Sequence, residues 1–471
     1  MVSSPGPPEI RIMNAEKDIV RNGVSSWRIM TRIGRSMAAM ALLLGATMGS
    51  GCAEEGGPGD EELLGVAGLA ILSQPSGWEK IEPGPDSISI PVQGSTTRTF
   101  SYTPGCSARP GTSSQYAFFI KPGDSNLLIH FMGGGACWDA DNCTGSTETG
   151  TYIPELNVIA SLDREIVASR VATGILSSTN TANPVSTYTK VYIPYCTGDI
   201  HWGAKDTTYT DPVTGNPTTI LHRGFHNFLA VLKYLQTNYP SSQLGKVVVT
   251  GQSAGGYGAV FNFPYIKETY RSNNTYLIVD AAAGVQSSNS QSQSIANWGA
   301  GPNAPDWITG ISSSGLSSIT AGAFIRAVAD HYSTTPVAQL TTAYDGAQRY
   351  FYNVGLLIDS NKSYVASSSM WGSSNGYDVA DSDSCDWKST MESYRSTAAG
   401  ASNYRSFTAP GDLHVLTTGT RFFQTTGSDS VVLSDWIDLM LAGSGSWTSK
   451  NCTSCSPPVT AQSSPSTLSC P

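Results

Sequence analysis

Short apolar runs recur along the middle of the chain and alternate with stretches of mixed polarity. Runs rich in Val, Ile and Leu occupy residues 126–132, 190–196, 246–252, 275–283 and 337–344. Continuous apolar strands of this kind are typical of a parallel sheet that is covered on both faces. Between two of them, residues 224–239 place apolar side chains on one face of an amphipathic helix, at Phe225, Phe228, Leu229, Leu232 and Leu235. The pattern predicts an α/β fold with crossover helices.

The N-terminus has a different pattern. Arg32 and Arg35 precede the apolar run Met37–Met48, which is followed by small residues and Cys52. This arrangement is typical of an export signal, and the run is shorter than the roughly 20 residues that span a bilayer. The residues Gly-Ser-Gly-Cys ending at Cys52 resemble a bacterial lipobox, with ordinary secretory cleavage as the alternative. We therefore expect an exported protein, bound to a membrane only through a possible lipid anchor at Cys52.

Composition divides the remainder of the chain. We expect an export signal over 1–52, a Gly/Glu-rich tether and lead-in over 53–85, one α/β domain over 86–443, and a Ser/Pro/Cys-containing extension over 444–471. Within the domain, the Ser/Gly/Asn-rich residues 285–320 have no clear period. They predict a long loop or a small excursion over the sheet.

Charge and cysteine content narrow the function. The net charge is −9, and residues 1–52 carry six basic and three acidic side chains, so the remainder carries −12. Such an acidic surface disfavours nucleic acid as a partner. Of nine cysteines, eight remain after Cys52, an even number that predicts disulfides in an exported protein. Cys452 and Cys455 form a C-x-x-C without a second pair at zinc spacing, which favours a disulfide or a loose tail over a metal site.

The run Val247–Gly258, VVVTGQSAGGYG, leads from a strand into a G-x-S-x-G sequence around Ser253. In α/β hydrolases this sequence forms a strained turn that presents a nucleophilic serine between a strand and a helix. A plain Gly/Ser turn is the alternative in a chain with 48 glycines. The preceding strand, and a following segment that can be helical as far as Pro264, favour the nucleophile.

A second glycine cluster follows the strand at 126–132. Gly133–Gly135 can direct backbone N–H groups toward a developing oxyanion, as the glycine loops of esterases do. We expect Gly134 and Gly135, with the N–H of Ala254, to form the oxyanion hole. A flexible loop is the alternative, and phosphate binding is disfavoured because no P-loop lysine motif follows.

Chain order narrows the choice of base and acid, since hydrolases place them after the serine in the order acid, then histidine. Only His331 and His414 follow Ser253. His331 lies in a helical pattern, whereas His414 lies in a Pro/Gly-bearing loop, so His414 is the predicted base. Asp280 and Asp345 end successive predicted strands, and the usual acid follows the second, which favours Asp345.

Several blocks together resemble the pectin acetylesterase/Notum family of serine carboxylesterases. They are GGGAC (133–137), TGILSS (173–178) with NP (183–184), VYIPYCTGD (191–199), GQSAGGYG (251–258), TAYDGAQ (342–348) and DLHVLTT (412–418). The resemblance places the catalytic residues on Ser253, Asp345 and His414, and the oxyanion glycines on Gly134 and Gly135. It also implies disulfides Cys137–Cys143 and Cys106–Cys196, and leaves Cys385, Cys452, Cys455 and Cys470 unassigned.

The resemblance implies an α/β-hydrolase fold, an acyl-enzyme mechanism and no cofactor or metal. Its commonest substrate is an O-acetyl ester on a polysaccharide such as pectin. Ala136 stands where plant members have Trp, and residues 285–335 do not align with the family. An esterase for longer acyl esters or lactones, and a non-catalytic glycan-binding surface lipoprotein, are therefore the alternatives. Trp138, Trp202 and Tyr257 either stack on sugar rings or are buried beside the sheet.

Overall fold

The computed structural model describes residues 77–93, 96–107, 113–144, 151–154, 156, 172–361, 379–453, 455 and 470. Contacts within the chain separate Met1–Gln74 from Pro75–Pro471, and every described residue belongs to the second unit. The predicted leader, Cys52 and most of the predicted tether lie outside the described residues.

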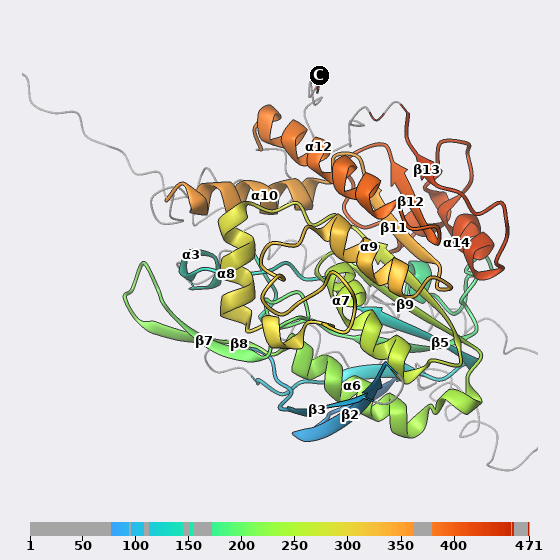
Figure 1. The fold of residues 1–471 in the computed structure, drawn as a ribbon, viewed down its shortest axis with the longest axis horizontal. Helices are drawn as coiled ribbons and strands as arrows, with labels where there is room; N and C mark the ends of the chain where they lie inside the picture. The colour runs from blue at the N-terminus through green and yellow to red at the C-terminus, as the bar shows by residue number, and fades with distance from the viewer. Residues whose placement is uncertain are drawn as a thin grey trace, which may run out of the picture. The chain divides into compact units, whose positions relative to one another are not determined.

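A nine-stranded sheet forms the centre of this unit (Figure 1). Its order is β1-β4-β6-β5-β9-β10-β11-β12-β13. Neighbours from β6 to β13 are parallel, whereas β4 is antiparallel to β6 and to β1. The strands are β1 Glu79–Ile81, β4 Phe118–Lys121, β5 Asp124–Phe131, β6 Tyr188–Ile193, β9 Lys246–Gln252, β10 Asn274–Asp280, β11 Val337–Thr342, β12 Tyr404–Ala409 and β13 Lys450–Asn451.

Burial explains why the apolar runs form the middle of this sheet. Every residue of β6 and β11 is buried, and β9 and β10 expose only their ends. Strands covered on both faces need apolar side chains at successive positions, not at alternate ones. The structure confirms the predicted α/β-hydrolase fold, with a mostly parallel sheet and helices on both faces.

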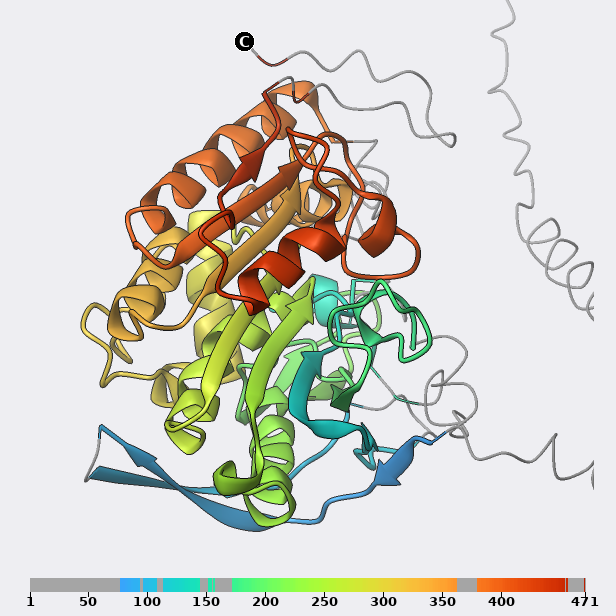
Figure 2. The ribbon, with the colours of Figure 1, turned by 90° about the vertical axis from the view of Figure 1, so that its right-hand side faces the viewer.

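Helices connect the parallel strands and cover the sheet. Figure 2 shows α14 on one face and α12 on the other, and α12 packs beside α9, which in turn contacts α7. The helices are α3 Ala140–Thr144, α6 Gly224–Asn238, α7 Ala254–Thr269, α8 Ser288–Trp298, α9 Ala321–His331, α10 Gly346–Asp359, α12 Asp381–Ala398, α13 Arg421–Gln424 and α14 Leu433–Leu441. Short 3₁₀ turns occur at η3 Gly174–Leu176, η4 Ser241–Gln243 and η5 Gly301–Asn303. Among the described residues, no helix is both long and apolar enough to span a membrane.

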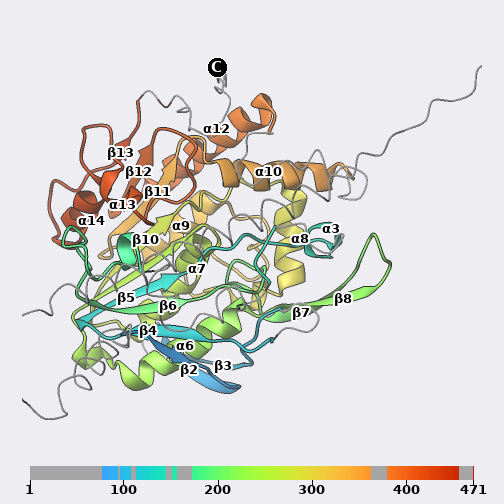
Figure 3. The same ribbon diagram turned by 180° about the vertical axis from the view of Figure 1, so that it is seen from behind.

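Two hairpins lie outside the central sheet. β2 (Asp86–Val92) pairs with β3 (Thr96–Tyr102), and β7 (Lys205–Thr210) pairs with β8 (Pro217–His222). The view from behind shows the first hairpin beside α6 (Figure 3), which it contacts. The apolar runs did not predict these hairpins, because their strands expose polar side chains on one face.

Two features differ from the sequence pattern. Strand β10 ends at Asp280, as expected for the strand tip, and the rest of the apolar run 275–283 leaves the strand because Ala281 has a left-handed φ of 54°. The segment 285–320, expected as a long loop or a small excursion over the sheet, contains α8. The helix after Ser253 continues through Pro264 to Thr269, since its packing against the strands outweighs the backbone hydrogen bond that proline cannot make.

Four disulfides connect described cysteines. Cys106–Cys196 and Cys137–Cys143 are the pairs that the family resemblance implied. Cys385–Cys470 joins α12 to the C-terminal segment, and Cys452–Cys455 closes the C-x-x-C. Part of the predicted C-terminal extension also forms β13, which pairs with β12.

Candidate active site

Ser253 lies at the turn between β9 and α7, in a backbone conformation that L-residues rarely adopt. Its φ is 55° and its ψ is −127°. Two neighbours have no room for a side chain: a Cβ on Gly251 would lie 1.9 Å from the Gly255 carbonyl oxygen, and one on Gly255 would lie 2.0 Å from that of Phe131. Glycine is therefore required on both sides of the serine. Strained residues of this kind cluster at active sites, where the surrounding packing holds them in place.

The glycine cluster after β5 lies against this turn. A Cβ on Gly133 would lie 2.9 Å from the Ser253 Cβ. Gly135 has a left-handed φ of 77°, and a Cβ there would lie 1.9 Å from the Thr151 carbonyl oxygen. The N–H groups of Gly134 and Gly135 donate to no acceptor in the described part of the chain.

Ala254 is the first residue of α7, so its N–H has no partner within the helix. The N-terminus of a helix also carries partial positive charge. Together these unused donors give the turn the chemistry of an anion-binding site.

His414 and Asp345 form a hydrogen-bonded pair. The Nδ1 of His414 lies 2.8 Å from Oδ1 and 3.0 Å from Oδ2 of Asp345. Asp345 is fully buried at the N-terminus of α10, where it also accepts a 3.0 Å hydrogen bond from the Gln348 N–H. Burial disfavours the charged imidazole, but the adjacent carboxylate outweighs this effect and raises the pKa of His414.

A cavity brings the serine and the histidine together. Ser253, Ala254, Gly135 and His414 all line it, and its volume is about 60 Å³. In the described part of the chain, the Ser253 hydroxyl and His414 form no hydrogen bond. Nucleophile and base are often not hydrogen-bonded when no substrate is bound. An adjoining cavity of about 40 Å³ shares lining residues, including Tyr257, Gln286 and Trp298.

The sequence did not predict the far wall of the cavity. Ser290 and Ser294 of α8 and Phe351 of α10 line it. The low hydrophobicity of α8 concealed the helix, but Gly299 provided a signal. That glycine ends α8 in a left-handed conformation, with a φ of 62°.

The alternative base, His331, and the alternative acid, Asp280, do not join the pair formed by His414 and Asp345. His331 is exposed at the end of α9 and does not line the cavity. The carboxylate of Asp280 is fully buried and accepts from the N–H groups of Leu416 and Thr417 and from the Thr417 hydroxyl. No hydrogen bond joins Asp280 to the His414 ring.

The three aromatic residues considered as sugar-stacking candidates do not all line the main cavity. Trp138 and Tyr257 line the main cavity, whereas Trp202 stacks on Phe261 with ring centroids 4.5 Å apart and lines only the adjoining one. The Tyr257 hydroxyl accepts a 2.9 Å hydrogen bond from the Gly284 N–H. Trp138 is nevertheless buried, with 5% of its surface exposed, so it forms part of the cavity wall beside the sheet.

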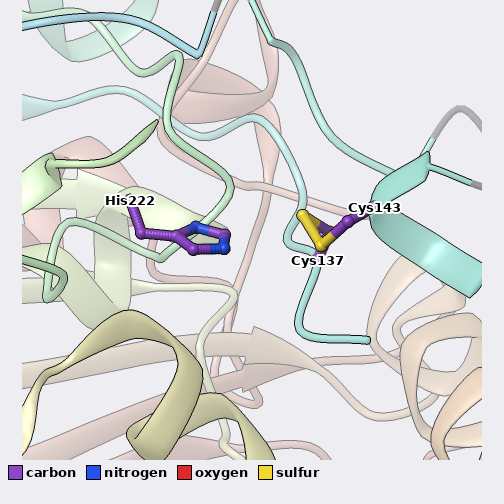
Figure 4. A group of neighbouring side chains, drawn as sticks. All are labelled: Cys137, Cys143 and His222. Atoms are coloured by element: carbon purple, nitrogen blue, oxygen red, sulfur yellow. A yellow bond between two sulfur atoms is a disulfide. The ribbon is translucent and has the colours of Figure 1, made fainter. Parts of the chain in front are cut away.

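One cluster has the composition of a metal site, at Cys137, Cys143 and His222 (Figure 4). The two sulfur atoms form a disulfide, so neither is available as a thiolate. The ring nitrogens of His222 lie 2.8 Å from the Thr197 carbonyl oxygen and 2.9 Å from the Tyr209 hydroxyl. These atoms are fully used in the fold and do not form a metal site.

Comparison with known proteins gives two sequence matches. The pectinacetylesterase family model matches residues 107–298. The palmitoleoyl-protein carboxylesterase NOTUM of Schmidtea mediterranea is 28% identical over 155 residues, which are 32% of this chain and 27% of that protein. Over these residues the chain is similar to the pectin acetylesterase/Notum family.

The solved structure of the Wnt deacylase Notum from Drosophila shares the fold of this chain. It superposes with a TM-score of 0.50 at 16% identity, over 80% of this chain and 98% of that one. The residues matched by the family model include the glycine cluster and Ser253, whereas Asp345 and His414 lie beyond them. The assignment of the acid and the base therefore depends on geometry and chain order.

Proposed function

We propose that this protein is a serine carboxylesterase that acts through an acyl-enzyme. The observation that carries the proposal is the hydrogen bond between His414 and Asp345 beside the cavity that contains the strained Ser253. Nucleophile, base and orienting carboxylate follow one another in the order of α/β hydrolases. The similarity of residues 107–298 to the pectinacetylesterase family model, and of 155 residues to a Notum carboxylesterase, supports the same reaction class.

In the first half of the reaction, Nε2 of His414 accepts the hydroxyl proton as Ser253 attacks the ester carbonyl. Asp345 keeps the proton of the neutral ring on Nδ1, so that Nε2 is the free base, and stabilises the charged ring that forms. The N–H groups of Gly134, Gly135 and Ala254 donate to the oxygen of the tetrahedral intermediate. His414 then protonates the departing alcohol, which leaves an acyl group on Ser253.

In the second half, water replaces the alcohol. His414 accepts a proton from this water, which attacks the acyl carbonyl in the same oxyanion hole. The intermediate collapses, Ser253 recovers its proton and the carboxylic acid leaves. In both halves the proposed nucleophile, base and oxyanion donors belong to this chain, and water is the second reactant.

We further propose short acyl esters on a polysaccharide, such as the O-acetyl groups of pectin, as the natural substrate. The main cavity has a volume of only about 60 Å³, which leaves little room for a long alkyl chain although its lining is mostly apolar. The family model's description as pectinacetylesterase favours acetyl. The palmitoleoyl-protein relative makes a long acyl group the alternative to be tested.

We also propose export to an oxidising compartment. Four disulfides are formed among the described cysteines, and such bonds persist outside the reducing cytosol. The Arg-flanked apolar run is the proposed signal, with Cys52 as the lipid attachment point. A mature N-terminus downstream of Cys52 would contradict lipidation but not export.

A single substitution tests the esterase proposal. Ser253→Ala is expected to abolish hydrolysis of p-nitrophenyl acetate and covalent labelling by a fluorophosphonate, with unchanged circular dichroism. Ser434→Ala, which removes a buried hydroxyl on α14 away from the cavity, is the control and is expected to retain both. Labelling that persists in Ser253→Ala would assign the nucleophile to another residue.

Substrate class needs a separate measurement. Acid release from acetylated pectin is compared with hydrolysis of p-nitrophenyl esters from acetate to palmitate. We expect kcat/KM to fall steeply beyond the shortest acyl groups. A maximum at the long esters would contradict the acetyl proposal and leave the serine mechanism intact.

A further inference from the structure

Three residues with left-handed backbone conformations surround Asp280 at the end of β10. They are Ser253 (φ 55°), Ala281 (φ 54°) and Val415 (φ 68°). Positive φ is uncommon outside glycine and is a true outlier for a β-branched residue such as Val415. Such conformations persist only where surrounding contacts fix them.

Asp280 supplies those contacts on the nucleophile side through its main chain. Its carbonyl oxygen accepts a 2.9 Å hydrogen bond from the Ser253 N–H. Strand β10 lies directly beside β9, with Asp280 in register with Gln252, the residue before the serine. The end of β10 therefore holds the nucleophile turn.

The side chain of the same residue holds the loop that carries the histidine. Its Oδ2 accepts from Leu416 N–H at 2.9 Å, from Thr417 N–H at 2.8 Å and from the Thr417 hydroxyl at 2.7 Å. These donors lie two and three residues after His414, beyond the strained Val415.

Arg421 of α13 completes the attachment from another direction. Its guanidinium donates to the carbonyl oxygens of His414, at 2.6 Å, and of Val415, at 3.2 Å. Arg421 therefore binds the carbonyl oxygens of the strained turn, and Asp280 binds the N–H groups of the two residues that follow it.

We propose that Asp280 is a positioning residue that fixes Ser253 and His414 relative to one another. This proposal rests on the serine esterase mechanism above. The main-chain oxygen of Asp280 binds the turn that carries Ser253, and its carboxylate binds the loop that carries His414. One residue therefore fixes the positions of both segments. No other carboxylate in the described residues bonds to the backbone of the His414 loop.

Burying the charged Asp280 carboxylate is energetically unfavourable, so its hydrogen bonds must compensate for the lost hydration. Asp280 is fully buried, and desolvation raises its pKa to about 6 although three donors and His414 favour its charged form. A threonine or asparagine would satisfy part of the loop with less desolvation. Only an ionised carboxylate accepts all of these donors with charge-assisted strength.

Asp280→Asn tests the proposal. The amide keeps the shape but presents N–H groups toward the donors of the loop. We expect kcat to fall about 10- to 100-fold with KM within about two-fold, because a small misplacement of the base affects the chemical step more than binding. Rates are expressed per folded molecule, measured by near-ultraviolet circular dichroism. Asp280→Glu, which keeps the charge, is expected to recover part of kcat.

Two matched variants separate positioning from folding. Glu268→Gln changes another buried carboxylate, which accepts from Arg271 and Tyr332 at the far end of α7, and is expected to alter stability but not kcat. Thr417→Val removes only the hydroxyl donor to Asp280 and is expected to lower kcat several-fold at unchanged KM. This variant decides the question if Asp280→Asn does not fold.

The pH profile provides a readout that stability alone does not move. The charged groups that act on the His414 ring are Asp345, Asp280 and Arg421, of which both carboxylates raise its pKa. Loss of the Asp280 charge is expected to shift the acidic limb of kcat/KM to lower pH, whereas Glu268→Gln leaves it in place. An unchanged kcat and pH profile in folded Asp280→Asn, or an unchanged kcat in Thr417→Val, would overturn the positioning role. An inactive wild-type protein would instead overturn the esterase proposal.

Discussion

The imidazole of His414 shares its Nδ1 proton with both oxygens of the buried Asp345 carboxylate, at 2.8 and 3.0 Å. Asp345 is also the N-cap of α10, so one side chain orients the ring and begins a helix that lines the cavity. The ring is thereby held from an element that also shapes the substrate site.

Asp345→Asn is predicted to lower kcat by roughly 10³- to 10⁴-fold, because the amide favours the wrong imidazole tautomer. Asparagine caps helices as well as aspartate, so the variant should fold. Steady-state kinetics with p-nitrophenyl acetate measures the loss, and the substitution Asp330→Asn, at an exposed position of α9, is the control. Normal turnover in the Asp345 variant would remove it from the mechanism.

The activity of the wild-type protein is predicted to rise with pH through a value above the usual 6.5 of histidine. The base must be neutral, and Asp345 raises the pKa of His414 despite its burial. In Asp345→Asn the burial effect remains and the carboxylate does not, so the acidic limb of the residual kcat/KM should move below that of the wild type. A limb at the same pH in both proteins would show that another group controls it.

Gly135→Ala is predicted to impair both stability and turnover. An alanine there adopts a left-handed conformation and brings its Cβ within 1.9 Å of the Thr151 carbonyl oxygen, so the oxyanion loop must move. Gly215→Ala is the matched control, since its φ of 70° is similar and its surroundings are open. The control should lose about 1 to 2 kcal/mol of unfolding free energy and keep its kcat.

If Gly135→Ala lost no more stability than Gly215→Ala and retained full kcat, the loop would not have the proposed role. Urea unfolding and p-nitrophenyl acetate hydrolysis on the same preparations distinguish these results.

Acid is predicted to destabilise the fold through buried histidines. Burial lowers the pKa of His130 to about 3 and those of His201 and His222 to about 4. Their folded pKa values lie below the unfolded value, so this stability is present above about pH 6.5 and is lost as pH falls. Burial raises the pKa of Asp199 and Asp280 to about 6, which has the opposite sign.

Between pH 6 and pH 4 the unfolded chain therefore binds about one more proton than the folded chain from these five groups. The free energy of unfolding should fall by about 1 kcal/mol per pH unit. Urea unfolding at several pH values measures the slope. His130→Phe on β5 should reduce it, whereas the exposed His331→Gln should change it less. A stability that increases below pH 6 would contradict the prediction.

The sequence predicted the sheet well where strands are buried on both faces. The run at 246–252 coincides with β9, because burial requires Val at successive positions. It failed for α8, whose Ser, Gln and Asn side chains face the cavity and solvent and give no apolar period. The apolar run at 275–283 extends beyond the end of β10 at Asp280, since Ala281 has a conformation that its identity does not suggest.

At the candidate site, chain order led to the pair Asp345 and His414, which the structure brings within hydrogen-bonding distance. The role of each in catalysis stays a prediction. The strain at Val415 and the double contact of Asp280 could not be predicted, because both depend on how distant segments meet. Sequence separation between Asp280 and Thr417 is 137 residues.

Helix α8 gives the fold a practical property. It lies in the segment between β10 and α9, outside the strands and turns that carry Ser253, Asp345 and His414, yet it forms one wall of the cavity. One wall of the cavity is thus encoded in a stretch of the gene separate from the residues that we propose to react. Libraries that vary residues 287–298 alone should yield esterases with altered chain-length preference on an unchanged catalytic framework.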